Sequence, residues 1–306
     1  METVAIRDPK TIGGSEISVV MGLNRWKSPL RLWAEKTGRI VTEDISDREY
    51  IQLGTELEDF VARRFSKLTG LPVRRDTRTF KHEKYPYMIG HIDRRITRAD
   101  EILECKTCNA WKAKEWEGDE IPMEYVLQVM WYLGLTKSSK GYIAVLIGGQ
   151  TFKWKEIEFD QELFDKMVEA AKNFVEVNIG QDLAPMAIGG DSATLMRMYP
   201  EQAEKIVVKR LDPETDALIK ALQEVKGVIK ISEDKKETLE ARIKQIIGDT
   251  EGVETLSFKT TWKAQSRSQV DSDLLKKEGL YDKYSKKINI RVLNVNKKKE
   301  QSNGTN

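Results

Sequence analysis

Asp93, Glu104 and Lys106 have the residue types and the spacing of a site that could hydrolyse a phosphodiester. Side chains alternate between the two faces of a β-strand, so a strand over 101–107 points Glu104 and Lys106 the same way. The polar residues 98–100 separate two apolar runs and predict a tight turn. Folding at that turn would bring Asp93 close to Glu104.

Two carboxylates placed this close repel each other unless a cation lies between them. Mg²⁺ suits such a pair because it prefers few carboxylates together with waters and phosphate oxygens. The ion could activate water and stabilise charge on the phosphate, while Lys106 orients the water or stabilises the developing negative charge. A hairpin with alternating surface charges would show the same short pattern in a chain that is 33% charged, so the surrounding elements must decide.

Two helices are predicted to flank these residues. The first covers 47–69 and ends at Gly70, and it places Gly54 and Glu58 on one face. Glu58 taken alone is typical of a solvated helix residue. The predicted buried stripe of this helix consists of Leu53, Leu57, Phe60, Val61, Phe65 and Leu68.

The second helix begins after Pro122 and covers 123–135, where Gln128 and Tyr132 lie four residues apart on one face. Residues 111–116, rich in Trp and Lys, are a loop or a short helix. Strands are predicted over 71–75, 77–81, 88–96, 101–107, 141–147 and 150–159, and a further helix over 160–177. This order predicts an α/β fold with a mixed sheet flanked by helices and the acids at one edge.

Ser15 follows two glycines at a predicted helix start, in the stretch Ile12-Gly13-Gly14-Ser15-Glu16. Backbone N–H groups and a hydroxyl at such a position could hold an anion. Ser15 could equally be an ordinary N-cap, which the sequence alone favours.

Composition indicates a globular protein outside the membrane. The chain has 306 residues, 40% of them hydrophobic, and we see no apolar run of about 18 residues and no signal peptide. Its two cysteines, Cys105 and Cys108, lack the further Cys or His residues of a zinc site, and ordinary thiols fit a reducing cytoplasm. We therefore expect a cytoplasmic protein.

The composition changes after Pro185, and we expect a linker over 186–210. Apolar residues at heptad spacing then predict a long helical arm over 211–248, which Ser232 and Lys236 weaken or turn into a hairpin. A small α+β module is predicted over 249–296, with strands over 256–263 and 288–295, followed by a disordered tail over 297–306. Residues 259–300 hold 12 Lys/Arg against 5 Asp/Glu, which indicates either a handle for DNA or a solubilising end.

Taken together, the motifs resemble the YqaJ-like viral recombinases, relatives of phage lambda exonuclease within the PD-(D/E)xK nuclease superfamily. The resemblance covers roughly residues 11–180 and implies a nuclease domain over 1–185 with a restriction-endonuclease-like core. It rests on the order and spacing of 12–16, 21–23, 35–38, 54–58, 90–93, 103–107, 122–128, Tyr132 and 146–149.

The resemblance implies roles for the matching residues. Asp93 and Glu104 would be metal ligands, the Cys105 carbonyl a third ligand, and Lys106 the catalytic lysine. Glu58 would position a second metal ion or its water. Two further positions, Gln128 and Tyr132, resemble a Q-x-x-x-Y helix motif that steadies the site.

The resemblance also implies how DNA is held. Ser15 would lie where relatives hold the terminal phosphate of the strand being digested. The arginine that relatives use on phosphate is not obvious here, and Arg7, Lys10 and Arg25 are the candidates. Lys153 is a further candidate for contact with the DNA backbone.

The function implied is a Mg²⁺-dependent exonuclease that digests double-stranded DNA ends from 5′ to 3′ and leaves 3′ single-stranded tails. Two ions per site are expected, and Mn²⁺ should substitute for Mg²⁺. A phage or prophage recombination system in a bacterial host would pass the tails to a single-strand annealing protein of the RecT or Beta type. A homo-oligomeric ring is compatible with the family. The alternatives are a structure-specific endonuclease or nickase, and a DNA-binding assembly protein without catalysis.

Overall fold

The computed structural model describes residues 10–42, 44–97, 99–202, 212–286 and 291–295. The chain divides into two units, Met1–Tyr199 and Pro200–Asn306. Arg7, one of the candidates for phosphate contact, lies outside the described residues. Within the described ranges, no helix has both the length and the apolar character needed to cross a bilayer.

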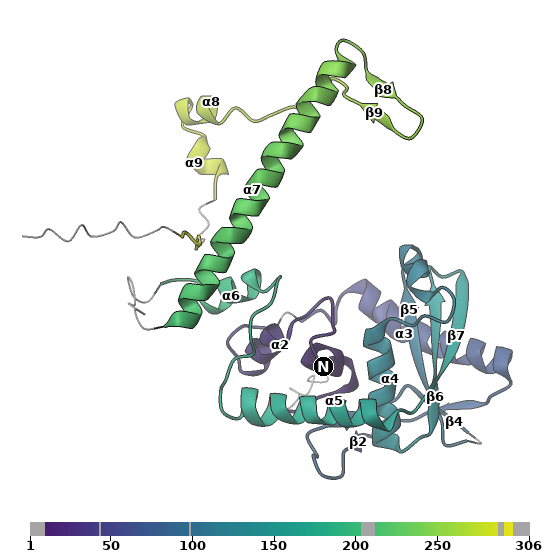
Figure 1. Cartoon of the computed structure of the whole chain (residues 1–306). Helices are drawn as coiled ribbons and strands as arrows, with labels where there is room; N and C mark the ends of the chain where they lie inside the picture. Colours follow the sequence, from purple (N-terminus) through teal and green to yellow (C-terminus); the bar gives the residue numbers. More distant parts are fainter. Residues whose placement is uncertain (1–9, 43, 98, 203–211, 287–290, 296–306) are drawn as a thin grey trace, which may run out of the picture. The chain divides into compact units, whose positions relative to one another are not determined.

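A five-stranded mixed sheet forms the centre of the first unit (Figure 1). Its order is β1-β4-β5-β6-β7, in which β5 and β6 run parallel and the other neighbours are antiparallel. The parallel pair requires a crossover, which contains the 3₁₀ helix η1 and helix α4. The strands are β1 (Val73–Arg75), β4 (Arg94–Ile96), β5 (Ile102–Cys108), β6 (Lys140–Ile147) and β7 (Thr151–Glu158).

Helices cover both faces of this sheet, and the predicted α/β fold with a mixed sheet is confirmed. Helix α3 (Glu49–Thr69) packs on one face through Val61 and Phe65, and α4 (Met123–Thr136) packs on the other as part of the larger core. The remaining elements of the unit are α1 (Gly14–Val20), α2 (Pro29–Lys36), β2 (Phe80–Lys81), β3 (Ile89–Gly90), η1 (Ala110–Trp116), α5 (Gln161–Asn173), the π-helical η2 (Phe174–Ile179) and α6 (Ser192–Met198).

The boundary of the first unit lies later than predicted. The segment expected to be a linker, 186–210, contains α6, and this helix contacts α2. Asp191, at its N-terminus, is 3% exposed and accepts a hydrogen bond from the Ser28 hydroxyl at 2.5 Å. A buried carboxylate needs such partners, so 186–199 belongs to the packed unit, which ends at Tyr199.

The second unit is dominated by α7 (Pro213–Ile247), one continuous helix of 35 residues. It passes Ser232 and Lys236 without a break, which excludes the hairpin alternative. After it come β8 (Gly252–Glu254), β9 (Lys259–Thr261), α8 (Ser272–Lys277) and α9 (Tyr281–Tyr284).

The predicted α+β module over 249–296 differs from the structure in its strands and its packing. Of the strand expected over 256–263 only β9 forms, paired in a short hairpin with β8, which precedes that range, and 291–295 is not a strand. Among the described residues of this unit only Ile247 is a buried hydrophobic, so the module has no core of its own there. The tail predicted over 297–306 and residues 288–290 lie outside the described residues.

Candidate active site

The sheet brings Asp93, Glu104 and Lys106 together as the alternation predicted. Antiparallel pairing of Arg94 with Leu103 places Asp93, just before β4, opposite Glu104 on β5. The Oδ2 atom of Asp93 accepts the backbone N–H of Cys105 at 2.7 Å. Lys106 Nζ lies 2.7 Å from Glu104 Oε1, and Glu104 is only 3% exposed.

Helix α4 completes a hydrogen-bonded network through two side chains one turn apart. Gln128 Nε2 donates to Glu104 Oε1 at 2.7 Å and to the Tyr132 hydroxyl at 3.1 Å. Gln128 Oε1 accepts from Lys106 Nζ at 3.0 Å. One amide therefore fixes the acid, the lysine and the tyrosine, as expected for groups at i and i+4.

Asp93 lies near a second negative charge, that of Glu104, which affects its pKa. Burial, with the negative charge of Glu104, raises the pKa of Asp93 to about 8. Burial opposes the charge of Lys106, but Glu104 outweighs it and the pKa of Lys106 is raised, so the amine is protonated at neutral pH. The second oxygen of Glu104, Oε2, is buried and has no hydrogen-bond partner among the described residues. A buried carboxylate oxygen without a partner needs a cation or a proton.

Arg94 contributes an interaction that the sequence reading missed. Its guanidinium is 4% exposed, donates to the Asp93 carbonyl oxygen at 2.6 Å and pairs with Glu58 and Asp59 of α3. It ties the backbone at Asp93 to the helix. The only sequence signal was its position beside Asp93, because strand alternation points it to the other face.

In this structure the Glu58 carboxylate is engaged by Arg94, and the metal role of Glu58 remains a prediction. A buried guanidinium must be paired, and Arg94 uses the Glu58 carboxylate for that purpose. Among the residues that the structure describes, no group of three His, Cys, Asp or Glu side chains is gathered that could hold a metal ion. Glu58 still lies close enough to contribute to the raised pKa of Asp93.

Cys105 contributes its backbone to the site and its thiol to the core. The side chain is buried in the cluster between α3 and the sheet, away from Lys106 as alternation predicted. Burial raises the pKa of this thiol, so it stays neutral. A ligand role for its carbonyl remains a prediction.

The structure does not place Ser15 at the cap of α1. Gly13 is the N-cap, its N–H donates to Glu16 Oε2 at 3.1 Å, and Ser15 is exposed on the helix. Gly14 instead makes room for Tyr132, because a Cβ at this position would lie 2.4 Å from the ring. Gly14 is explained by packing against the Tyr132 ring, and a phosphate role for Ser15 remains a prediction.

Two predicted DNA contacts are engaged within the protein. Arg25 pairs with Glu115 at 2.7 Å and with Glu124 at 2.8 Å, so it is not a free cation for phosphate. Lys153 Nζ donates to the backbone carbonyl of Trp116 at 2.8 Å. Arg25 and Lys153 therefore contact residues of η1, and Arg25 also contacts α4, while their roles in DNA binding remain predictions.

Substituting Gly14 and Gly54 tests the packing against Tyr132. We expect Gly14→Ala to lower the free energy of unfolding by roughly 1–3 kcal/mol, because the added methyl displaces a buried ring. Gly54→Ala is the matched control, since its nearest contact is Thr107 Oγ1 at 3.8 Å. It should stabilise α3 by about 0.5–1 kcal/mol. Urea unfolding measures both, and equal effects would contradict the packing role.

Fold and site define an α/β protein in which a buried glutamate, a half-buried aspartate and a lysine meet at the two adjacent strands β4 and β5. Because β5 is the central strand of the mixed sheet, the acids do not lie at its edge as predicted. The YqaJ-like viral recombinase domain matches residues 4–139. The YqaJ protein of Bacillus subtilis (strain 168) is 36% identical over 294 residues, which covers 94% of this chain and 91% of that protein. The chain belongs to the YqaJ-like viral recombinase family.

Solved structures with a similar fold include an alkaline exonuclease (LHK-Exo) from Laribacter hongkongensis. It is 19% identical, with a TM-score of 0.48, over 57% of this chain and 92% of that one. A phage-related exonuclease from Haemophilus somnus 129PT is 16% identical, with a TM-score of 0.43, over 56% of this chain and 96% of that one.

Proposed function

We propose that this protein is a divalent-metal-dependent nuclease that hydrolyses DNA in phage-type recombination. The observation that carries the proposal is the buried Glu104 carboxylate. One of its oxygens is held by Lys106 and Gln128, and the other has no partner among the described residues. Membership of a viral recombinase family supports DNA as the substrate.

The residues present suit Mg²⁺, with Mn²⁺ as a substitute. Asp93 and Glu104 supply two carboxylates, and the remaining positions would fall to waters, substrate and the Cys105 carbonyl, which is the ligand pattern Mg²⁺ prefers. The raised pKa of Asp93 has the sign expected of an acidic pair that awaits a cation. When bound, the ion would acidify water and neutralise charge on the phosphate. A second ion is less well supported, because Glu58 is engaged by Arg94.

The side chains of the network have separate tasks in this proposal. Protonated Lys106 stabilises negative charge that develops on the phosphate oxygens. Gln128 holds Glu104 and Lys106 at fixed separation, so neither must reorganise during the reaction. Tyr132, packed against Gly14, restricts the amide of Gln128. The result is a rigid site rather than a pair of mobile surface acids.

We extend the proposal to 5′→3′ digestion of duplex ends that leaves 3′ tails for a single-strand annealing protein. The test uses linear duplex labelled at the 5′ or at the 3′ end, with Mg²⁺, Mn²⁺ or EDTA, and a covalently closed circle of the same sequence. Early release of 5′-labelled mononucleotide, with the circle intact, is expected. Cutting of the circle would show an endonuclease or nickase, and binding without any cleavage would leave only a DNA-binding protein.

An exposed tryptophan beside the site is suited to hold a DNA base. Trp26 is 65% exposed, with Arg25 Cζ 5.4 Å and Lys112 Nζ 5.0 Å from its ring centroid. Arg25 in turn pairs with Glu124, one turn before Gln128 on α4. An aromatic ring with cations nearby is typical of surfaces that stack bases of single strands.

Trp26→Ala should weaken DNA binding about 10-fold, because stacking on one base contributes roughly 1–3 kcal/mol. Trp26→Phe should retain most of the affinity. Fluorescence anisotropy with partly single-stranded DNA in EDTA measures both without cleavage. Tyr50→Ala is the control, since Tyr50 is an aromatic residue of α3, is 60% exposed and lies outside the basic segment 259–300. Equal losses from Trp26→Ala and Tyr50→Ala would contradict a specific platform.

A further inference from the structure

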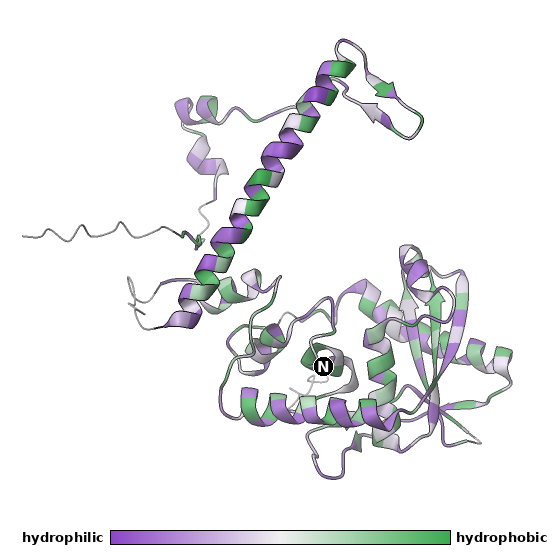
Figure 2. Ribbon diagram, viewed as in Figure 1, coloured by the Kyte–Doolittle hydropathy of each residue, from purple (hydrophilic) through white to green (hydrophobic). Residues whose placement is uncertain are grey.

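Helix α7 carries an apolar stripe that the described residues leave uncovered. The stripe positions Leu218, Val225, Ile229, Leu239, Ile243 and Ile246 are each between 40% and 71% exposed. Together with Leu222, Ser232 and Lys236 they recur at spacings of three and four, and Figure 2 shows hydrophobic residues returning along α7 between hydrophilic ones. A helix of 35 residues with such a stripe is amphipathic and needs a partner to bury it.

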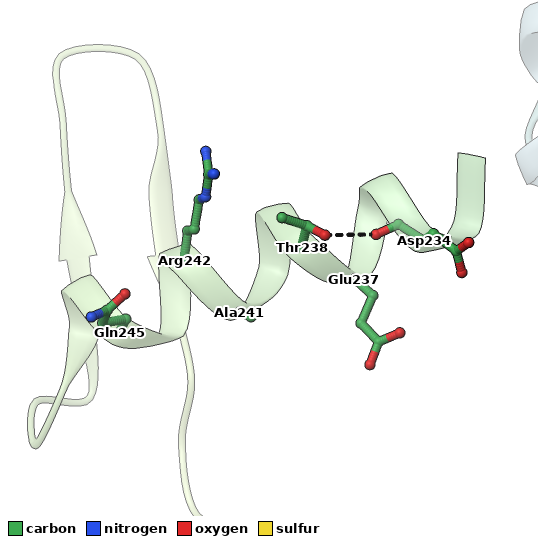
Figure 3. A pocket seen from close by; sticks show the side chains of 6 residues that line it. All are labelled: Asp234, Glu237, Thr238, Ala241, Arg242 and Gln245. Carbon is green, nitrogen blue, oxygen red and sulfur yellow. Dashed lines mark hydrogen bonds between the residues drawn. The ribbon is translucent and has the colours of Figure 1, made fainter. Parts of the chain in front are cut away.

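A hollow on another side of α7 is lined mostly by polar side chains (Figure 3). Its lining residues are Asp234, Glu237, Thr238, Ala241, Arg242 and Gln245. All of them come from this one helix, and Thr238 Oγ1 bonds to the Asp234 carbonyl at 2.9 Å. The hollow shares no residue with the candidate active site. The partner therefore belongs on the stripe.

We infer that α7 pairs with α7 of a second copy of this chain in antiparallel orientation. When the second helix runs in the opposite direction and the two Asp234 residues lie at the same level, the stripe of one copy faces the stripe of the other. Between Leu222 and Ile246 each apolar position then meets an apolar position, and each polar position meets a polar one, while Leu218 lies beyond the paired segment. The facing pairs are Leu222 with Ile246, Val225 with Ile243, Ile229 with Leu239, and Ser232 with Lys236.

Orientation follows from the polar residues in the middle of the stripe. In a parallel pair in the same register, Lys236 would face Lys236 of the second copy inside the seam, where two ammonium groups repel. Reversal places each Lys236 opposite a Ser232 hydroxyl. It also places Lys226 beside Glu240 of the second copy at the edge of the seam. The like charges that then meet, at Glu233 and Lys235, lie at exposed edges where water and salt screen them.

Disulfide trapping tests the orientation directly in the full chain with Cys108→Ser. Leu222→Cys and Ile246→Cys are made in separate chains of different tag size, mixed and oxidised. The two positions lie about 36 Å apart along one helix, so neither a parallel pair nor a single chain can bridge them. A disulfide between the two tagged chains is expected. Leu222→Cys homodimers would show a parallel pair and overturn the inference.

Sedimentation equilibrium tests the stripe itself. Ile243→Glu should raise the dimer dissociation constant at least about 100-fold, because each dimer loses two buried apolar contacts. Ala241→Glu, two residues away on the polar side, should leave the dimer intact. A wild-type monomer at micromolar concentration would overturn the inference and indicate that the stripe is covered within one chain. Neither readout depends on DNA cleavage, so the proposed nuclease function stands or fails separately.

Discussion

Glu104→Gln is expected to slow DNA cleavage by at least about 100-fold while the fold and DNA binding are retained. The substitution keeps the shape of the side chain but removes the charge that would hold a cation and that pairs with Lys106 at 2.7 Å. Loss of a single preorganised electrostatic contact at a reacting centre commonly costs about 100- to 1,000-fold. Lys106→Ala should give a loss of similar size, because it removes the cation that stabilises the phosphate.

A nearby glutamate provides the control for this experiment. Glu101 lies just before β5 and pairs more loosely with Lys140, at 3.8 Å. Glu101→Gln should change the initial rate on linear duplex by less than about 3-fold, since a partly exposed pair contributes little. Thermal unfolding and anisotropy with DNA in EDTA verify fold and binding. Glu104→Gln protein that cleaves within about 10-fold of wild type would eliminate the proposed mechanism.

The second large effect is a pH dependence of stability that comes from Asp93. Its pKa is about 8 in the folded chain without metal, against an ordinary value of 3.8. Between these values the folded state binds a proton that the unfolded state has lost, so the free energy of unfolding falls as pH rises from about 4 to about 8. The slope from this one group is at most about 1.4 kcal/mol per pH unit.

Asp93→Asn should remove that component and stabilise the protein in EDTA at pH 8. Asp76→Asn should do the opposite, because Arg78 holds the pKa of the buried Asp76 well below its usual range. That pair contributes stability above about pH 4 which is lost on acidification. Urea unfolding at pH 5 to 8 compares the variants with wild type. Parallel wild-type and Asp93→Asn curves would refute the raised pKa.

Mg²⁺ should reverse the effect of Asp93 on stability. A cation favours the ionised carboxyl group, so the stabilisation by millimolar Mg²⁺ should grow with pH up to about 8 and be absent in Asp93→Asn.

The sequence predicted which residues of the candidate site share a face wherever those residues lie close together in one strand or helix. Glu104 and Lys106 share a face because alternation along a strand has a period of two. Gln128 and Tyr132 share a face because they are four apart on a helix. The pairing of β4 with β5 then places Asp93 beside Glu104. The crossover between the parallel strands β5 and β6 places Gln128 and Tyr132 of α4 against the sheet.

Relations between distant segments were not predictable in the same way. The periodicity of α3 was clear, yet Leu53, Phe60 and Leu68 are exposed while Val61 and Phe65 are buried. Helical spacing shows which residues share a face, but the width of the sheet decides how much of that face is covered. The pairing of Arg94 with Glu58 likewise joins residues 36 positions apart.

The sequence by itself determined the chemistry available to this protein, because two acids, a lysine and an amide are placed by short-range periodicity. Only the tertiary structure decided which of these side chains are engaged by other residues of the protein. Packing committed Glu58 to Arg94, Arg25 to Glu115 and Glu124, and Gly14 to the Tyr132 ring, and it left one oxygen of Glu104 without a described partner. Burial makes each charge require a partner, and which partner is within reach depends on contacts between segments far apart in the chain.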